Sequence, residues 1–154
     1  MRRVVLMLAS VVLMTVVGSA QQTASKPNFS GTWVQTSPDD GGGGERVIIH
    51  DATTLKEQHA ADGPDHRMEF ILDGKEHETE PVDAGSGHAM TGHYKATWTG
   101  AKLVIEQVTD YQNGFHREAT QTWTLDGKGQ LVIDLATNLP DGSKMQLTIV
   151  SRKK

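Results

Sequence analysis

Two stretches of the chain repeat one pattern of side chains. The first is Thr97-Trp98-Thr99 followed by Leu103-Val104-Ile105-Glu106, and the second is Thr122-Trp123-Thr124 followed by Leu131-Val132-Ile133-Asp134. Each has an arm of β-branched and aromatic residues, a break that contains glycine, and a second apolar arm that ends in an acid. This is the pattern of a β-hairpin. Two such hairpins in series predict an antiparallel meander.

The breaks between the arms predict how each hairpin pairs. Gly100-Ala101 fits a two-residue turn with glycine first, which places the tryptophan of the first arm opposite Leu103. The second break, at residues 126–129, fits a loop of three or four residues, and the choice moves every facing pair by one position. A three-residue loop repeats the first hairpin and places Trp123 opposite Leu131. This is the register we predict.

Alternation of apolar and polar residues continues on both sides of the hairpins. Further strands are expected at 29–35, 45–50, 55–59, 68–72, 75–80 and 145–149. Asp73-Gly74 is a two-residue hairpin signal, and residues 81–92 are interpreted as the longest internal loop. No segment has a convincing 3.6-residue apolar period. We therefore expect an all-β fold of about eight to ten strands, an antiparallel up-and-down meander closed or nearly closed into a barrel.

The N-terminus has the composition of a secretory signal peptide. Arg2-Arg3 is basic, the run from Val4 to Val17 is apolar, and the small residues Gly18-Ser19-Ala20 follow. The apolar run is shorter than the roughly 20 residues that a membrane-spanning helix needs, which favours a cleaved signal over a membrane anchor. We expect a signal peptide at 1–20, a flexible leader at 21–28 and a single domain at 29–152, exported to the periplasm or the extracellular space.

Charge and composition exclude several classes of function. The chain carries 19 acidic and 15 basic residues, and loss of residues 1–20 removes two basic residues and no acid, which leaves 134 residues with a formal charge of −6. An acidic protein is a poor partner for nucleic acid or for an anionic membrane. The absence of cysteine excludes thiolate metal sites and cysteine nucleophiles. No enzyme motif is present, so neither catalysis nor a cofactor is expected.

Gly31-Thr32-Trp33 opens the first expected strand, and a meander follows it to the C-terminus. This arrangement resembles the lipocalin and fatty-acid-binding superfamily, the calycins, whose first strand carries a Gly-x-Trp motif. It is also similar to small exported bacterial proteins that open with Phe-Ser-Gly-Thr-Trp. The resemblance implies a barrel that holds a small apolar or amphipathic ligand. It also implies a basic residue from a late strand against the motif's tryptophan, for which Arg152 is the candidate.

Alternation assigns a set of side chains to the expected interior, among them one cation. A buried charge is costly unless it is paired. Arg117 is therefore salt-bridged to an inward acid, solvated at a wide rim, or available to the anionic head of a ligand. The candidate ligand-binding residues are Tyr94, Trp98, Leu103, Phe115, Arg117, Gln121 and Trp123.

Seven histidines raise the question of a metal or haem site. Metal ligation requires two or three ligands that converge on one point. His93 and His116 are the weak candidates, since they lie close to the same expected strands. Alternation places both on the outward face, which favours ordinary surface histidines and no bound metal.

Three classes of function fit these observations. A binding barrel for a small apolar or anionic ligand predicts an interior that a ligand can reach, whereas a protein-interaction or inhibitor module predicts a filled interior and an exposed apolar patch. A metal or haem binder predicts converging histidines. The sequence makes no prediction of the oligomeric state.

Overall fold

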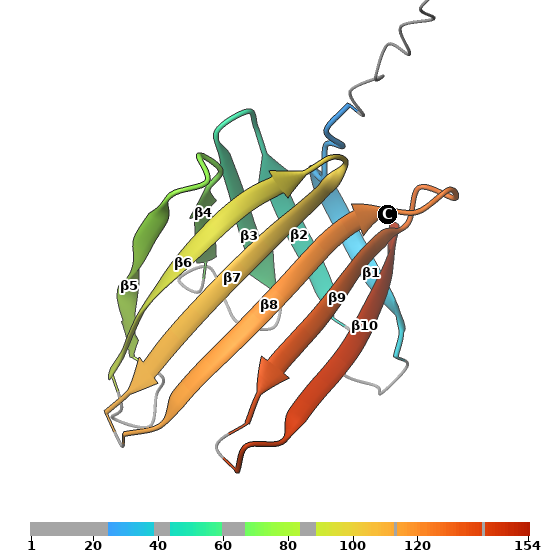
Figure 1. Ribbon diagram of the computed structural model, residues 1–154. Coiled ribbons are helices and arrows are strands. Elements are labelled where there is room, and N and C mark those ends of the chain that lie inside the picture. Colours follow the sequence, from blue (N-terminus) through green and yellow to red (C-terminus); the bar gives the residue numbers. More distant parts are fainter. Residues whose placement is uncertain (1–24, 39–43, 60–66, 84–88, 113, 140) are drawn as a thin grey trace, which may run out of the picture.

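The computed structural model describes residues 25–38, 44–59, 67–83, 89–112, 114–139 and 141–154. The expected signal peptide, the first part of the leader and residues 84–88 lie outside these residues. No helix among the described residues is long and apolar enough to cross a membrane. The structure contains ten strands (Figure 1): β1 (Gly31–Ser37), β2 (Glu45–His50), β3 (Thr54–His59), β4 (Arg67–Ile71), β5 (Glu76–Asp83), β6 (Ala89–Thr99), β7 (Lys102–Tyr111), β8 (His116–Leu125), β9 (Leu131–Asn138) and β10 (Lys144–Lys153).

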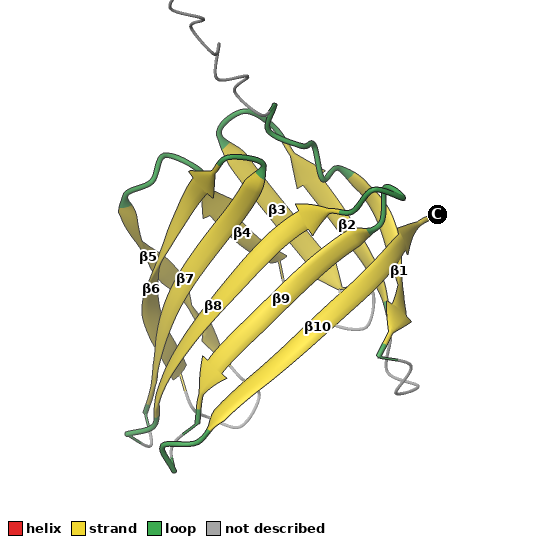
Figure 2. Cartoon of the chain, turned by 45° about the vertical axis from the view of Figure 1, so that its right-hand side comes forward, coloured by secondary structure: helices red, strands yellow, loops and turns green. Residues whose placement is uncertain are grey.

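All ten strands belong to one antiparallel sheet that curls into a nearly closed barrel (Figures 1 and 2). The strand order is β4-β3-β2-β1-β10-β9-β8-β7-β6-β5, so the first and last strands pair with each other. The expected all-β meander is confirmed. Its two edges are β4 and β5, which follow each other in the sequence.

The hairpin predicted at Asp73-Gly74 does not form. A two-residue turn of that type needs positive φ at both positions, but only Gly74 has it, with φ 74°. The end of β4 is anchored elsewhere, because the Leu72 amide donates to the Thr53 carbonyl oxygen at 2.7 Å. The turn therefore joins two strands that face each other across the seam of the barrel.

Side chains close this seam where backbone pairing is missing. The Tyr94 hydroxyl of β6 accepts a hydrogen bond of 3.0 Å from the Ile71 amide of β4. The Tyr94 ring also packs edge-on against Phe70, with ring centroids 5.1 Å apart, and stacks on His77 at 5.6 Å. His77 Nε2 in turn contacts Asp73 Oδ1 at 2.8 Å. Tyr94 is thus the side chain that links β4 to the opposite edge of the sheet.

Strands extend further into residues 81–92 than the sequence suggested. β5 continues to Asp83 and β6 begins at Ala89, so most of the expected loop is sheet. β5 is an edge strand with four acidic residues and a proline. Charge and proline on an edge strand discourage pairing with another chain.

The two sequence-similar hairpins differ in register. Trp98 faces Leu103, as predicted. Trp123 faces Ile133 rather than Leu131, so the predicted three-residue loop is wrong. The connection between β8 and β9 spans residues 126–130, and within it the Asp126 amide donates to the Gln130 carbonyl oxygen at 2.9 Å. The carboxylate of Asp126 accepts two further amide hydrogen bonds within the same loop, and this capping stabilises the longer turn.

The Gly-x-Trp motif has a steric explanation at one end of the barrel. Gly31 has φ 143°, and a Cβ there would collide with the aliphatic chain of Lys153. The missing side chain lets Lys153 cross Gly31 and place its Nζ 5.6 Å from the centre of the Trp33 ring. The basic partner is therefore Lys153 and not Arg152. Arg152 pairs with Val34 and follows Ser151, whose side chain lies on the inner face, so the side chain of Arg152 points outward.

Aromatic rings fill this same end of the barrel, which we call the closed end. Phe29 stacks on Trp98 at 6.0 Å and on His50 at 5.4 Å, and it meets Trp123 edge-on at 5.9 Å. His50 Nδ1 accepts a hydrogen bond from the Phe29 amide at 3.1 Å, which requires the unprotonated nitrogen. Burial lowers the pKa of His50 and supports this form. The closed end is thus a packed core.

Candidate binding site

The opposite end of the barrel, which we call the open end, is less well covered. In Figure 2 it carries the β7–β8 and β9–β10 connections, far from the C-terminus. Inward-facing Met68, Met145 and Leu147 are 44%, 39% and 36% exposed there. β1 pairs only with residues 150–153 of β10, so the described residues provide no strand partner for the first half of β10 on that side. Solvent therefore reaches apolar side chains on the inner face.

A chain of polar contacts crosses the interior between the two ends, and we call it the polar belt. It begins with Arg46 and Glu57, which are only 6% and 5% exposed and form an ion pair of 2.9 Å. The Arg46 guanidinium lies 5.9 Å from the centre of the Trp123 ring. Trp123 Nε1 donates to Gln121 Oε1 at 2.9 Å, and Gln121 Nε2 donates to Gln107 Oε1 at 2.8 Å. The belt separates the aromatic core from the open end.

Arg117 of β8 lies on the open-end side of the belt and is partly buried. Its Nε donates to Thr137 Oγ1 at 3.2 Å, and Thr137 is itself buried and donates to the Glu118 carbonyl oxygen at 2.9 Å. No carboxylate among the described residues forms an ion pair with Arg117. Of the three alternatives predicted for Arg117, the salt bridge to an inward acid is therefore not found among the described residues. The other N–H donors of the guanidinium have no partner among the described residues, and Thr137, which its Nε contacts, pairs with Ala119.

The sequence-derived candidate residues do not gather in one place. Leu103 and Trp123 are fully buried, and Trp98 packs against the same core, so these three belong to the closed end. Gln121 lies in the polar belt, Arg117 lies at the open end, and Tyr94 lies at the seam. Phe115 precedes β8 and stacks on Tyr111 at 5.0 Å beside the β7–β8 turn. The structure thus brings only part of the predicted set to the open end.

Several interior residues were missed by reasoning from the sequence. Arg46, Glu57 and Gln107 form the polar belt with two of the predicted residues, and Met68 and Met145 line the open end. The available signal was alternation, because Arg46 shares the parity of Ile48 on β2, and Gln107 shares that of Ile105 on β7. Without knowledge of their contact partners, polar residues at such positions are interpreted as surface residues.

The histidines considered as metal ligands lie apart from the interior. His93 pairs with Val108 on the outward-facing row of β6, and His116 is exposed at the start of β8. His116 Nδ1 contacts Asp110 Oδ1 at 2.7 Å, and this hydrogen bond raises the pKa of His116. Within the described ranges, no three His, Cys, Asp or Glu residues are grouped so that they could hold a metal ion.

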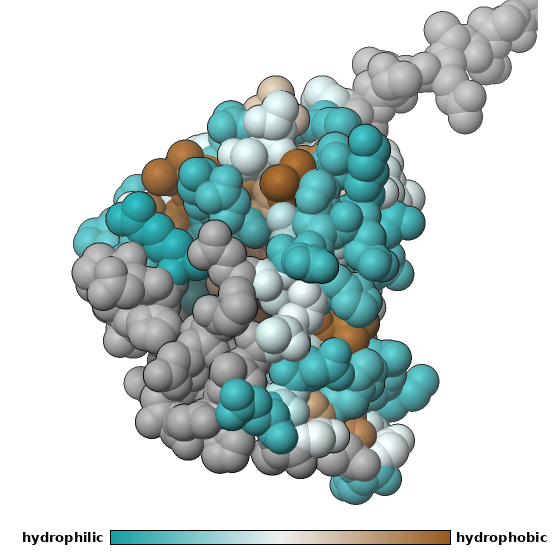
Figure 3. Space-filling model, turned by 90° about the vertical axis from the view of Figure 1, so that its left-hand side faces the viewer, coloured by the Kyte–Doolittle hydropathy of each residue, from teal (hydrophilic) through white to brown (hydrophobic). Residues whose placement is uncertain are grey.

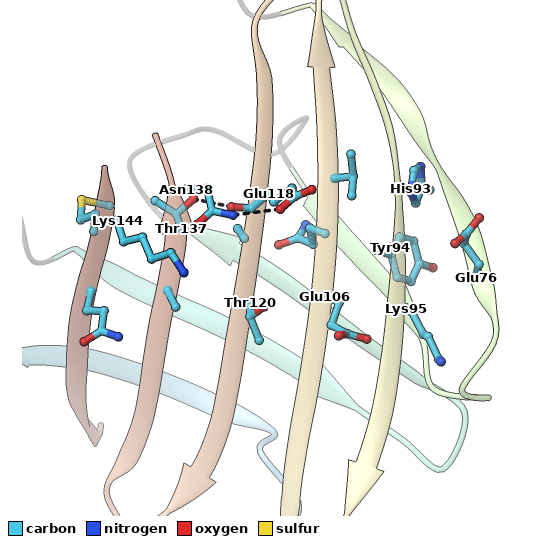
Figure 4. A pocket seen from close by; sticks show the side chains of 16 residues that line it. Glu76, His93, Tyr94, Lys95, Glu106, Glu118, Thr120, Thr137, Asn138 and Lys144 are labelled. Carbon is cyan, nitrogen blue, oxygen red and sulfur yellow. Dashed lines mark hydrogen bonds between the residues drawn. The ribbon is translucent and has the colours of Figure 1, made fainter. Parts of the chain in front are cut away.

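A pocket of about 460 Å³ opens on the outer face of β5–β10 (Figure 4). Outward side chains of neighbouring strands line it, and the inward residues of the intervening row, such as Tyr94 and Gln107, complete it. Glu118 holds one wall in place, since its Oε2 accepts from Asn138 Nδ2 at 2.8 Å. The labelled lining residues are Glu76, His93, Tyr94, Lys95, Glu106, Glu118, Thr120, Thr137, Asn138 and Lys144. Carboxylates and lysines are interspersed, so the pocket does not favour one sign of charge.

Few large apolar side chains are exposed on the outer face among the described residues, and two of them, Val47 and Ile49, are neighbours on β2. Val47, Ile49 and Ile71 are outward-facing and exposed. On the face that carries β4 and β5, apolar atoms occur in small areas that polar side chains separate (Figure 3). This face has no continuous apolar surface among its described residues of the kind that marks a large protein interface.

No protein-family model and no curated protein matches the chain. The fold is a nearly closed ten-stranded barrel that is compatible with a lipocalin-like barrel.

Proposed function

We propose that this chain is a calycin-type binding protein that holds a small amphipathic anion at the open end of the barrel. The observation that carries the proposal is Arg117, an inward-facing guanidinium without a carboxylate partner among the described residues. Apolar side chains that solvent reaches, Met68, Met145 and Leu147, lie at the same end. A cation beside apolar surface suits a ligand with an anionic head and a short apolar part.

The polar belt limits how deep such a ligand lies. Arg46 and Glu57 neutralise each other, so the belt offers no free charge, and the residues beyond it form a buried hydrophobic core. We therefore propose a compact ligand bound between the belt and the rim. The basic and then apolar composition of residues 2–17 supports export of the protein, to the periplasm or the extracellular space.

Replacement of Arg117 tests this function. We expect isothermal titration calorimetry to detect binding of octanoate to the wild-type protein and not of octyltrimethylammonium, which has the opposite charge. Arg117→Met should weaken octanoate binding at least about tenfold, because charge-assisted hydrogen bonds contribute roughly 1.5–3 kcal/mol.

Arg152→Met is the matched control, because Arg152 is exposed on the outward face of β10. It removes the same charge from the protein and should leave the octanoate affinity unchanged. Equal loss in both variants would mean that net charge, and not the open end, governs binding. A wild-type protein that binds neither probe would refute the proposed function.

A further inference from the structure

Hydrogen bonding in the polar belt has a fixed direction. The indole N–H of Trp123 can only donate, so Gln121 must present its oxygen to it. The amide nitrogen of Gln121 is then the group that faces Gln107, and it donates to Gln107 Oε1. Gln107 must therefore place its own NH₂ group at the end of the chain. Because the first donor cannot be reversed, neither can the two amides that follow.

The terminal NH₂ group of Gln107 has no partner among the described residues. Gln107 faces inward and is partly exposed, so its donors are accessible from the interior. Across β7 and β8 it pairs with Ala119, and Arg117 lies two positions before Ala119. Diagonal neighbours of this kind are roughly 7–8 Å apart. The side chain of Ala119, the residue that pairs with Gln107, is a single methyl group.

We propose that Gln107 is a specificity-determining residue that recognises a second hydrogen-bond acceptor next to the anionic group bound by Arg117. This inference rests on the proposed function and names its ligand class: carboxylates that carry an oxo, hydroxy or second carboxylate group near the first. Gln107, which pairs with Ala119, and Arg117, two residues before Ala119, both present donors. Thr137 is occupied, because it accepts from Arg117 and donates to Glu118. A ligand that offers acceptors at two points satisfies both donors, and a plain alkyl carboxylate satisfies one.

A pair of probes that differ by one acceptor tests the proposal. We expect the wild-type protein to bind 2-oxooctanoate about fivefold more tightly than octanoate in calorimetric titrations, since a net hydrogen bond contributes roughly 0.5–1.5 kcal/mol. Gln107→Met keeps the length of the side chain and removes the donor. In this variant the ratio of the two affinities should fall to about one, while octanoate binding remains.

Two further variants make the result specific. Gln107→Glu keeps an acceptor for Gln121 and removes the terminal donor. Its carboxylate repels both acids and should weaken both affinities, but their ratio should still fall to about one even if Gln107→Met folds poorly. Gln146→Met makes the same substitution on the exposed outward face of β10 and should keep the wild-type ratio. Equal affinities of the wild-type protein for both acids, or a preference that persists in Gln107→Met and Gln107→Glu, would overturn the role of Gln107. Failure of both acids to bind the wild-type protein would instead refute the proposed function.

Discussion

Replacing Glu57 with glutamine should lower the free energy of unfolding by about 3–5 kcal/mol, because it leaves a buried guanidinium without its counter-charge. Glu57 and Arg46 are almost completely buried, and their ion pair of 2.9 Å stands in the centre of the barrel. His59 also contacts Glu57 Oε1, at 3.1 Å, but it is far more exposed and can be solvated when the carboxylate is lost. Urea denaturation of the two proteins measures the difference.

A neighbouring ion pair supplies the control. Lys56 and Glu69 lie 3.0 Å apart on the exposed face of β3 and β4. Glu69→Gln should cost less than about 1 kcal/mol, as is usual for exposed pairs. The double variant Arg46→Met/Glu57→Leu should recover most of the stability lost in Glu57→Gln, because it removes both charges and retains apolar volume. If Glu57→Gln and Glu69→Gln cost the same, the buried pair does not have the central role described here.

Gly92→Ala should destabilise the protein by about 3 kcal/mol, near the upper end of the usual cost of overpacking. A Cβ at this position would overlap the carbonyl oxygen of Val108 and press on Thr109 Cα. Both are backbone atoms of the adjacent strand β7, which is paired on its other side with β8, so neither can move away cheaply. Thermal or urea unfolding reports the loss.

Gly127→Ala is the matched control for this prediction. Gly127 lies in the β8–β9 loop, its φ is not positive, and a Cβ there would have no neighbour within 4 Å. The substitution should change the free energy of unfolding by no more than about 0.5 kcal/mol. Similar behaviour of the two alanine variants would show that β6 and β7 do not approach each other as closely as the structure indicates.

The alternation of residues was sufficient to predict the all-β meander and most strands, because each strand has one buried and one solvated face. Two errors came from turns. Asp73-Gly74 has the local signature of a hairpin, but in this barrel it joins the two edge strands, β4 and β5, which do not pair with each other. The Leu72 amide at the end of β4 donates to the Thr53 carbonyl oxygen and not to β5. At residues 126–130 the Asp126 carboxylate stabilises a longer loop than the glycine spacing suggested.

The binding site was less accessible to sequence reasoning for a different reason. Arg117 could be placed inside from its parity with Trp123, but whether it had an acidic partner depends on contacts between distant strands. Arg46 and Glu57 lie on adjacent strands β2 and β3 and are not direct cross-strand partners, since Arg46 pairs with His59. Their ion pair therefore depends on the conformations of the two side chains and could not be predicted from the strand register. The terminal donor of Gln107, which has no partner among the described residues, can be identified only once the contacts of Trp123 and Gln121 are known.

The central claim is that a compact anion binds on the inner face at the open end, and methyl NMR of the wild-type protein tests it most directly. Met68 and Met145 are solvent-accessible on the inner face, whereas Ile49 and Ile71 are exposed on the outer face of β2 and β4. Titration with 2-oxooctanoate should shift the methyl signals of Met68 and Met145 in a saturable manner and leave those of Ile49 and Ile71 unchanged. Shifts at the two isoleucines without shifts at the two methionines would contradict the claim.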